Sequence, residues 1–439
     1  MAQDIKKLYL FHLLLSVSLT AVGSFLFIDR LFLRLGLSMS QFGLIKGTAF
    51  LVPVTLNLVL SPYIARLGRD REIVAVSYGL RVFLPYLFLL LPWFPVSASL
   101  LTLICALIFM VTLICPVVAH TSLSSLCRYH IPQEKLGMHM GYILSLMTVP
   151  SVILAVPASW YIDLHTAESD SRFYGAFLHV FLATTLFILA AAWFILRLNP
   201  RKESAPRRRR PGFTDIAEPF RNRPYRVFLH ASFMLSMVGT MITSFINPYL
   251  LGPQNLSMFQ VSLITVLVST VGVGLRRLWG HMCDEYGGKN VLRISVVGVA
   301  AALFVLTGKG LIPILIYAVM AWNVTEGLFG AGLFTGQQYL SLALSDGERT
   351  NVYIAATSFA NGTGMFAGSL LGGFLLDWLA GQIRVEQTGA HYAIYFTYCA
   401  LLYLVVGHFV TALRERRRRV RSTELVLRMY RALRSKMRR

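Results

Sequence analysis

Twelve long apolar segments constrain the fold of this chain more than any other feature. Each is close to the roughly 20 mostly apolar residues that an α-helix needs to cross a bilayer. Charged residues make up only 14% of the 439 residues, against about a quarter in soluble domains. We therefore predict an all-α membrane protein. Its twelve transmembrane helices are expected at residues 8–28, 42–64, 73–93, 97–118, 141–162, 174–196, 227–250, 259–279, 291–306, 311–333, 352–376 and 393–413.

A basic segment divides these helices into two sets of six. We expect an N-terminal bundle over residues 1–196, a basic linker over 197–226, a C-terminal bundle over 227–413 and a basic tail over 414–439. Twelve crossings place both termini and the linker on one side of the membrane, together with most of the 41 Lys and Arg residues. Because Lys and Arg concentrate in cytoplasmic loops, both termini are predicted to be cytoplasmic. Short loops on the other side suggest a bacterial inner membrane.

Loops at corresponding positions of the two sets are similar. Residues 61–72, after the second helix, and residues 280–289, after the eighth, are both tight basic turns that contain glycine. Residues 131–141 and 345–353 correspond in the same way, after the fourth and tenth helices. This pattern predicts two six-helix repeats of parallel orientation.

Gly280, Asp284, Gly287 and Lys289 resemble the G-x-x-x-D-x-x-G-x-K/R loop of the major facilitator superfamily. The resemblance extends over residues 8–413 and implies the twelve-helix, six-plus-six major facilitator fold. It also implies a secondary transporter that works by alternating access, with its substrate near the midplane between the bundles. In the first copy of the loop, Ala65 or Arg66 stands where the family has an Asp.

The resemblance further implies that residues 280–289 form a conformational latch. Asp284 would accept hydrogen bonds from the N-terminus of a neighbouring helix, where the helix dipole favours an anion. The alternative is a solvated turn whose charges only set the membrane topology.

Two charged residues fall deep inside predicted helices, where charge is costly and is a functional candidate by default. Arg81 is expected near the middle of the bilayer, so it needs a carboxylate, an aqueous cavity or an anionic substrate beside it. Glu326 is the carboxylate deepest inside the second half and is the leading candidate for proton coupling. A structural ion pair is the alternative for both, and the sequence does not say whether they touch.

Other polar residues within the helices are candidates for binding or coupling. Asp29 and Lys46 are expected to pair across a short turn, with a structural or gating role favoured over substrate contact. Four uncharged residues at middle depth could contact a solute or bridge helices at a modest gain. They are Asn57, Asn323, Gln337 and Asn361.

Several classes of protein are disfavoured. No nucleophile–base pair, metal-binding spacing or nucleotide loop is visible, so we expect no enzyme activity, no metal and no cofactor. The net charge of +21 lies mainly in the linker, the tail and loops on one side, so no nucleic-acid partner is expected. The basic tail is instead predicted to bind the anionic inner leaflet. A monomer is expected.

These observations favour a secondary active transporter of a small organic solute, coupled to protons or another ion. An anionic or polyhydroxylated solute is favoured, because cations outnumber carboxylates inside the first half. The alternative is a drug or lipid efflux pump of the same fold, which would have a largely apolar cavity open to lipid.

Overall fold

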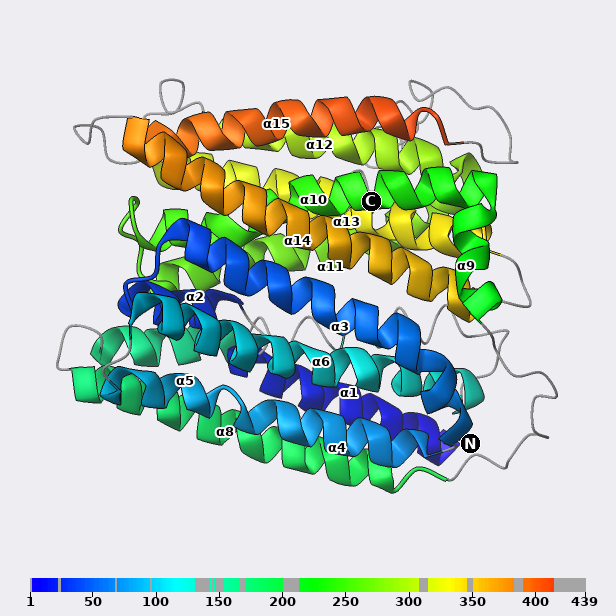
Figure 1. The fold of residues 1–439 in the computed structure, drawn as a ribbon, viewed down its shortest axis with the longest axis horizontal. Helices are drawn as coiled ribbons and strands as arrows, with labels where there is room; N and C mark the ends of the chain where they lie inside the picture. Colours follow the sequence, from blue (N-terminus) through cyan, green and yellow to red (C-terminus); the bar gives the residue numbers. More distant parts are fainter. Residues whose placement is uncertain are drawn as a thin grey trace, which may run out of the picture.

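Two helical bundles lie side by side in the computed structural model, in contact along α3 and α14 (Figure 1). The structure describes residues 2–413 with gaps. The gaps are residues 23–24, 68, 95–96, 131–142, 144–145, 147–153, 166–169, 200–212, 308–314, 346–349 and 383–389. The predicted tail and most of the basic part of the linker therefore lie outside the described residues.

The N-terminal bundle is built from long apolar helices. They are α1 (Ala2–Val22), α2 (Phe25–Arg34), α3 (Met39–Leu67), α4 (Asp70–Phe83), α5 (Tyr86–Leu90), η1 (Leu91–Trp93), α6 (Ala98–His130), the helical residues 154–165 and α8 (Asp170–Leu196). The single helix expected over 73–93 is interrupted between α4 and α5. Pro85 lies at that point, and it cannot donate a backbone hydrogen bond to the preceding turn.

The C-terminal bundle contains the six predicted helices, with α13 ending ten residues later than predicted, and it begins with one short additional helix. Its elements are α9 (Phe213–Arg221), α10 (Arg223–Leu251), α11 (Met258–Tyr286), α12 (Gly288–Thr307), α13 (Leu315–Ala343), α14 (Thr350–Gln382) and α15 (Ala390–Val410). α9 and the first turn of α10 lie inside the segment that the sequence predicts to be a linker. Phe220 of α9 packs against Phe359 of α14, which attaches this segment to the C-terminal bundle.

The helices run roughly along one axis, so the molecule has two distinct ends (Figure 1). We call one the linker end: α1 begins there, α8 and α15 end there, and α10 begins there after the linker. We call the other the opposite end: α2 and α14 end there, and α3 and α11 begin there. In the view of Figure 1 the linker end is on the right.

Apolar side chains cover much of the outside of both bundles, as expected for helices in lipid. The exposed examples include Leu186, Trp193, Leu371, Phe374 and Trp378. Within the described residues, eight helices are long and apolar enough to cross a membrane. The predicted all-helical membrane fold is therefore confirmed.

Small residues allow α3 and α14 to approach closely. A Cβ atom on Gly43 would overlap the carbonyl of Ser369, and one on Gly373 would overlap the carbonyl of Met39. Close approach of backbones through small residues is the usual way that membrane helices associate without a hydrophobic driving force. The two bundles therefore meet helix against helix along this line.

Glycines that repeat every four residues on α14, at Gly364, Gly368 and Gly372, pack within their own bundle. Added Cβ atoms on Gly364 and Gly368 would overlap backbone atoms of α10, at Phe233 and Met237. α14 therefore has two glycine-lined sides, one against α10 and one against α3.

Candidate functional site

A buried ion pair lies where α2, α3 and α10 meet. Lys46 Nζ of α3 is 2.7 Å from Asp29 Oδ1 of α2, and the two side chains are 1% and 0% exposed. The ion pair expected from the sequence between these residues is therefore present. It lies toward the opposite end, because Lys46 is in the second turn of α3, which begins there, and Asp29 is in the short helix α2, which ends there.

The second bundle completes this site. Lys46 Nζ donates a hydrogen bond to the carbonyl of Ser244 on α10, at 2.9 Å. Asn247, one turn further along α10, donates from Nδ2 to Asp29 Oδ2 at 3.2 Å. A lone buried charge is strongly unfavourable, so these contacts satisfy both charges at once. The ion pair is thus shared between the bundles, which the sequence does not reveal.

A carboxylate of the C-terminal bundle caps α3 at the opposite end. Asp377, near the end of α14, accepts hydrogen bonds from the backbone N–H groups of Met39 at 3.3 Å and Ser40 at 2.8 Å. These are the first two residues of α3, where the helix dipole and unpaired N–H groups favour an anion.

The N-terminal bundle caps α11 in the same way. Asp163, in the helical residues 154–165, accepts hydrogen bonds from the N–H groups of Met258 at 3.2 Å and Phe259 at 2.7 Å. Met258 is the first residue of α11. Each bundle therefore supplies one capping carboxylate and one capped helix to the other.

These caps are not among the features predicted from the sequence, although the sequence contains a signal for them. Leu37-Ser-Met-Ser-Gln41 and Leu256-Ser-Met-Phe-Gln260 share the pattern L-S-M-x-Q at the start of the second helix of each half. Ser at the N-cap with Gln three residues later is a capping box, and it forms at both helices. The capping carboxylates are far away in sequence, so only the fold brings them to these helices.

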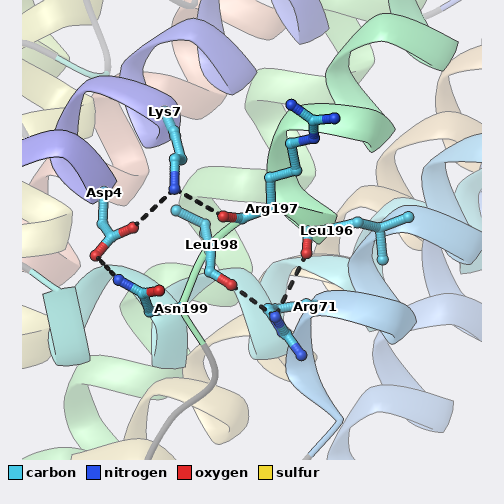
Figure 2. A network of polar contacts seen from close by, with 7 residues as sticks. All are labelled: Asp4, Lys7, Arg71, Leu196, Arg197, Leu198 and Asn199. Carbon is cyan, nitrogen blue, oxygen red and sulfur yellow. Dashed lines mark hydrogen bonds and ion pairs between the residues drawn. The ribbon is translucent and has the colours of Figure 1, made fainter.

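Basic residues at the linker end cap the last turn of α8 (Figure 2). Arg71 donates to the carbonyl of Leu198 at 2.6 Å, and Lys7 donates to the carbonyl of Arg197 at 2.8 Å. Lys7 also pairs with Asp4, which in turn accepts a hydrogen bond from Asn199. Cations are favourable at a helix C-terminus. All of these bonds join the N-terminal bundle to itself or to the three residues that directly follow α8.

Lys289 caps the C-terminus of α15 in the second half of the chain. Its Nζ donates to the carbonyls of Thr411 and, at 2.7 Å, Leu413, just after α15.

The other residues of the predicted latch loop have varied surroundings. Gly287 ends α11 at a positive φ of 88°, a conformation that suits glycine. Gly280 lies in open surroundings. The side chain of Asp284 is outside the described residues, so the predicted latch by Asp284 stays a prediction. The described bonds of Lys289 lie within its own bundle.

Arg81 and Glu326 are not paired within the described residues. Arg81 is buried in the last turn of α4, near Tyr78 and Cys115, and its Nε has no hydrogen-bond partner there. Glu326 is half-buried on α13, with its carboxylate folded along its own helix toward Gly330.

The predicted uncharged site residues have different surroundings. Asn361 Oδ1 on α14 accepts hydrogen bonds from Gln337 Nε2 of α13 at 2.8 Å and Ser236 Oγ of α10 at 3.1 Å. Asn361 and Gln337, both predicted as candidates, therefore link α10, α13 and α14 of the C-terminal bundle. Asn57 is half-buried on α3, and the side chain of Asn323 lies outside the described residues.

A pocket of about 310 Å³ opens beside α1, α8 and the helical residues 154–165. Its walls are mainly apolar, and Tyr161 and His179, which are hydrogen-bonded to each other at 2.8 Å, also line it. No group of His, Cys, Asp and Glu side chains among the described residues is arranged to hold a metal ion.

Comparisons with known proteins agree with this fold. The family model of the Major Facilitator Superfamily matches residues 8–322 and residues 231–436. Among solved structures, the chain is similar to the nucleoside transporter NupG, with 15% identity, a TM-score of 0.67 and coverage of 94% of this chain and 98% of that one. A bacterial homolog of the human lysosomal transporter Spinster, in an inward-facing and unoccupied conformation, gives 15% identity, a TM-score of 0.66 and the same coverages. No curated protein sequence matches.

The family match covers most of the chain, and the helical bundles and structural likenesses agree with it. The family that the sequence resembles is thereby confirmed. The protein belongs to the Major Facilitator Superfamily, and it is an integral membrane transporter rather than an enzyme.

Proposed function

We propose that this transporter moves a small organic solute by alternating access, coupled to protons. The observation that supports this most is the ion pair Asp29–Lys46, because its partners on α10 belong to the other bundle. Opening the opposite end has to separate Lys46 from Ser244 and Asp29 from Asn247. The site therefore belongs to a contact that forms and breaks during the cycle.

The orientation follows from the basic residues. The helices that precede the basic linker and the basic tail in the sequence, α8 and α15, both end at the linker end, where the cationic helix caps also lie. Lys and Arg concentrate on the cytoplasmic side, so we assign the linker end to the cytoplasm. The contacts between bundles at the opposite end then correspond to a state closed on the outside.

Glu326 is the proposed proton carrier. It is a half-buried carboxylate on α13, and no cation pairs with it among the described residues. Asp29, in contrast, is held by Lys46 and Asn247. A carboxylate inside the membrane that can gain and lose a proton without breaking an ion pair suits proton coupling.

The proposed solute is anionic or polyhydroxylated. Arg81 supports this choice, since its buried guanidinium has an unsatisfied Nε and no carboxylate partner in the described part of the chain. Asn361 and Gln337 add hydrogen-bonding groups in the other bundle.

Uptake into proteoliposomes tests this function. Labelled anionic and polyhydroxylated solutes are offered with and without a pH gradient. We expect Glu326→Gln to lose accumulation driven by the gradient while it keeps exchange of solute between the two sides. Glu72→Gln, at an exposed carboxylate beside the linker end, is the matched control and should behave as the parent protein. Unchanged accumulation by Glu326→Gln would remove Glu326 from the coupling step.

A drug or lipid efflux pump is the second candidate. The apolar pocket beside α1 and α8 favours it, because its lining includes Leu154 and Phe187, whose apolar side chains are exposed on the outside of the bundle. Growth-inhibition assays in a host without its own pumps distinguish the two. Protection against apolar toxic compounds, without uptake of polar solutes, would favour efflux.

A further inference from the structure

We propose that Asp163 and Asp377 are two repeat-related latches that together hold the opposite end closed. Each bundle supplies one carboxylate, and each carboxylate binds the first turn of a helix in the other bundle. This inference rests on the proposed alternating access and identifies residues that set the balance between its two states.

The N–H groups at the start of α3 show why a partner from the other bundle is needed. The first four N–H groups of a helix have no partner inside the helix. Here Ser38 N–H donates to Gln41 Oε1 at 2.7 Å, and Gln41 N–H donates to Ser38 Oγ at 3.3 Å. The two N–H groups between them, of Met39 and Ser40, donate to Asp377. Two of the four are thus satisfied locally and two only when the bundles are together.

The first four N–H groups of α11 are satisfied in the same way, two within the helix end and two by the other bundle. Ser257 N–H donates to Gln260 Oε1 at 2.9 Å, and Gln260 N–H donates to Ser257 Oγ at 3.2 Å. Met258 and Phe259 donate to Asp163. The agreement at both helices, in residue type and in bonding, indicates an arrangement that belongs to the internal repeat.

The reciprocal arrangement has a mechanical consequence. Asp377 ties α14 to α3, and Asp163 ties the helical residues 154–165 to α11, so two different helix pairs are fastened between the same two bundles. Rocking the bundles apart at the opposite end has to release both ties. Release of only one would leave the other as a pivot.

The two latches are suited to repeated opening. Both carboxylates are half-buried, so water can reach them and the freed N–H groups once the bundles separate. The Asp29–Lys46 pair is almost fully buried and lies deeper. We infer that the carboxylates set the balance between states, because their release exchanges protein hydrogen bonds for hydrogen bonds with water.

Distances between spin labels test this without any substrate, so a failed search for the solute does not affect the result. The labels are placed on cysteines introduced at Ser171 of α8 and Gln382 of α14, which are exposed, near the opposite end and in different bundles. The native cysteines are replaced in the parent, and the distance distribution is measured in proteoliposomes. The variants are Asp163→Asn, Asp377→Asn and the double variant.

We expect each single Asn variant to raise the ratio of open to closed molecules about fivefold to thirtyfold, as for loss of a partly buried anion at a helix N-terminus. The double variant should give about the product of the two effects, because the latches share no partner. Unchanged distances in all three variants would overturn the proposal. A shift in only one single variant would also overturn it, because the latches would not be equivalent.

Ser38→Ala and Ser257→Ala are the matched controls. They weaken the same two helix ends, but the bonds that they remove lie within one bundle. We expect lower thermal stability and unchanged label distances. If these variants open the opposite end as much as the Asp variants do, loosened helix ends explain the effect and the latch proposal fails.

Discussion

The opposite end and the linker end of this transporter use their polar groups differently. At the opposite end, Asp163, Asp377 and the Asp29–Lys46 pair all make bonds from one bundle to the other. At the linker end, Arg71 and Lys289 make their described bonds within a single bundle. Anions cap helix N-termini at one end, and cations cap helix C-termini at the other.

This difference separates two tasks. Bonds within a bundle strengthen it as a rigid body, and they persist whether the bundles lie together or apart. Bonds between bundles favour one conformation over the other, because they exist in only one of the two states. Variants at the opposite end should therefore change conformation, whereas variants of Arg71 and Lys289 at the linker end should change stability alone.

The largest effect is expected from Lys46→Met. It leaves the Asp29 carboxylate buried without its cation and removes the bond to Ser244. We expect a loss of about 3–5 kcal/mol in the free energy of unfolding, measured by equilibrium unfolding in detergent. Adding Asp29→Asn should recover a large part of that loss, since no buried charge then stays unpaired. A double variant as unstable as Lys46→Met would contradict this account.

A smaller effect is expected from Gly43→Ala, which places a methyl group against the carbonyl of Ser369. Overpacking of this kind costs about 1–3 kcal/mol, and it acts only in the closed state because α14 supplies the carbonyl. Labels at Ser171 and Gln382 should therefore report more open molecules. Gly79→Ala is the control, since no atom lies near its added Cβ. Equal distances in both variants would argue against a close α3–α14 contact.

Changes at the linker end should be smaller still and should leave the conformation as it is. Arg71→Met and Lys289→Met each remove a cation from a helix C-terminus. We expect each to lower the free energy of unfolding by about 1 kcal/mol, with unchanged label distances. A clear shift toward the open state in either variant would break the distinction between the two ends.

The smallest effect concerns Asp4, which precedes the first membrane segment. Burial acts to raise the pKa of this carboxyl, but hydrogen bonds from Asn199 and Lys7 and the Lys7 charge together lower it below its ordinary value. Its contribution to stability is therefore complete above the unfolded pKa, about 3.9, and is lost as the pH falls through the folded pKa. The stability difference between the parent and Asp4→Asn should shrink as the pH is lowered from 7 toward 3, measured by thermal unfolding. A constant difference would contradict this.

Much of the fold was predictable from the sequence because long apolar segments have few alternatives in a bilayer. Helix positions agree to within a few residues at α8, α10 and α15. The break at Pro85 and the helix α9 were not predicted. Pro85 interrupts a segment whose apolar character continues unchanged, and α9 is too short and polar to resemble a membrane helix.

The candidate site was only partly predictable. Asp29 and Lys46 are close in the chain, so their pairing follows from a short turn. The capping roles of Asp163 and Asp377 do not follow, because their partners are 95 or more residues away. Asn361 and Gln337 were considered as solute contacts, and the structure shows that they also bond to each other.

The sequence by itself determined the helices, the two halves and the family, because hydrophobicity, charge asymmetry and the repeated loops are local properties of the chain. Only the tertiary structure decided which polar groups of one half meet the other. Those contacts depend on how two rigid bundles pack, and residues such as Asp377 and Ser40 come within 2.8 Å only after both bundles have formed.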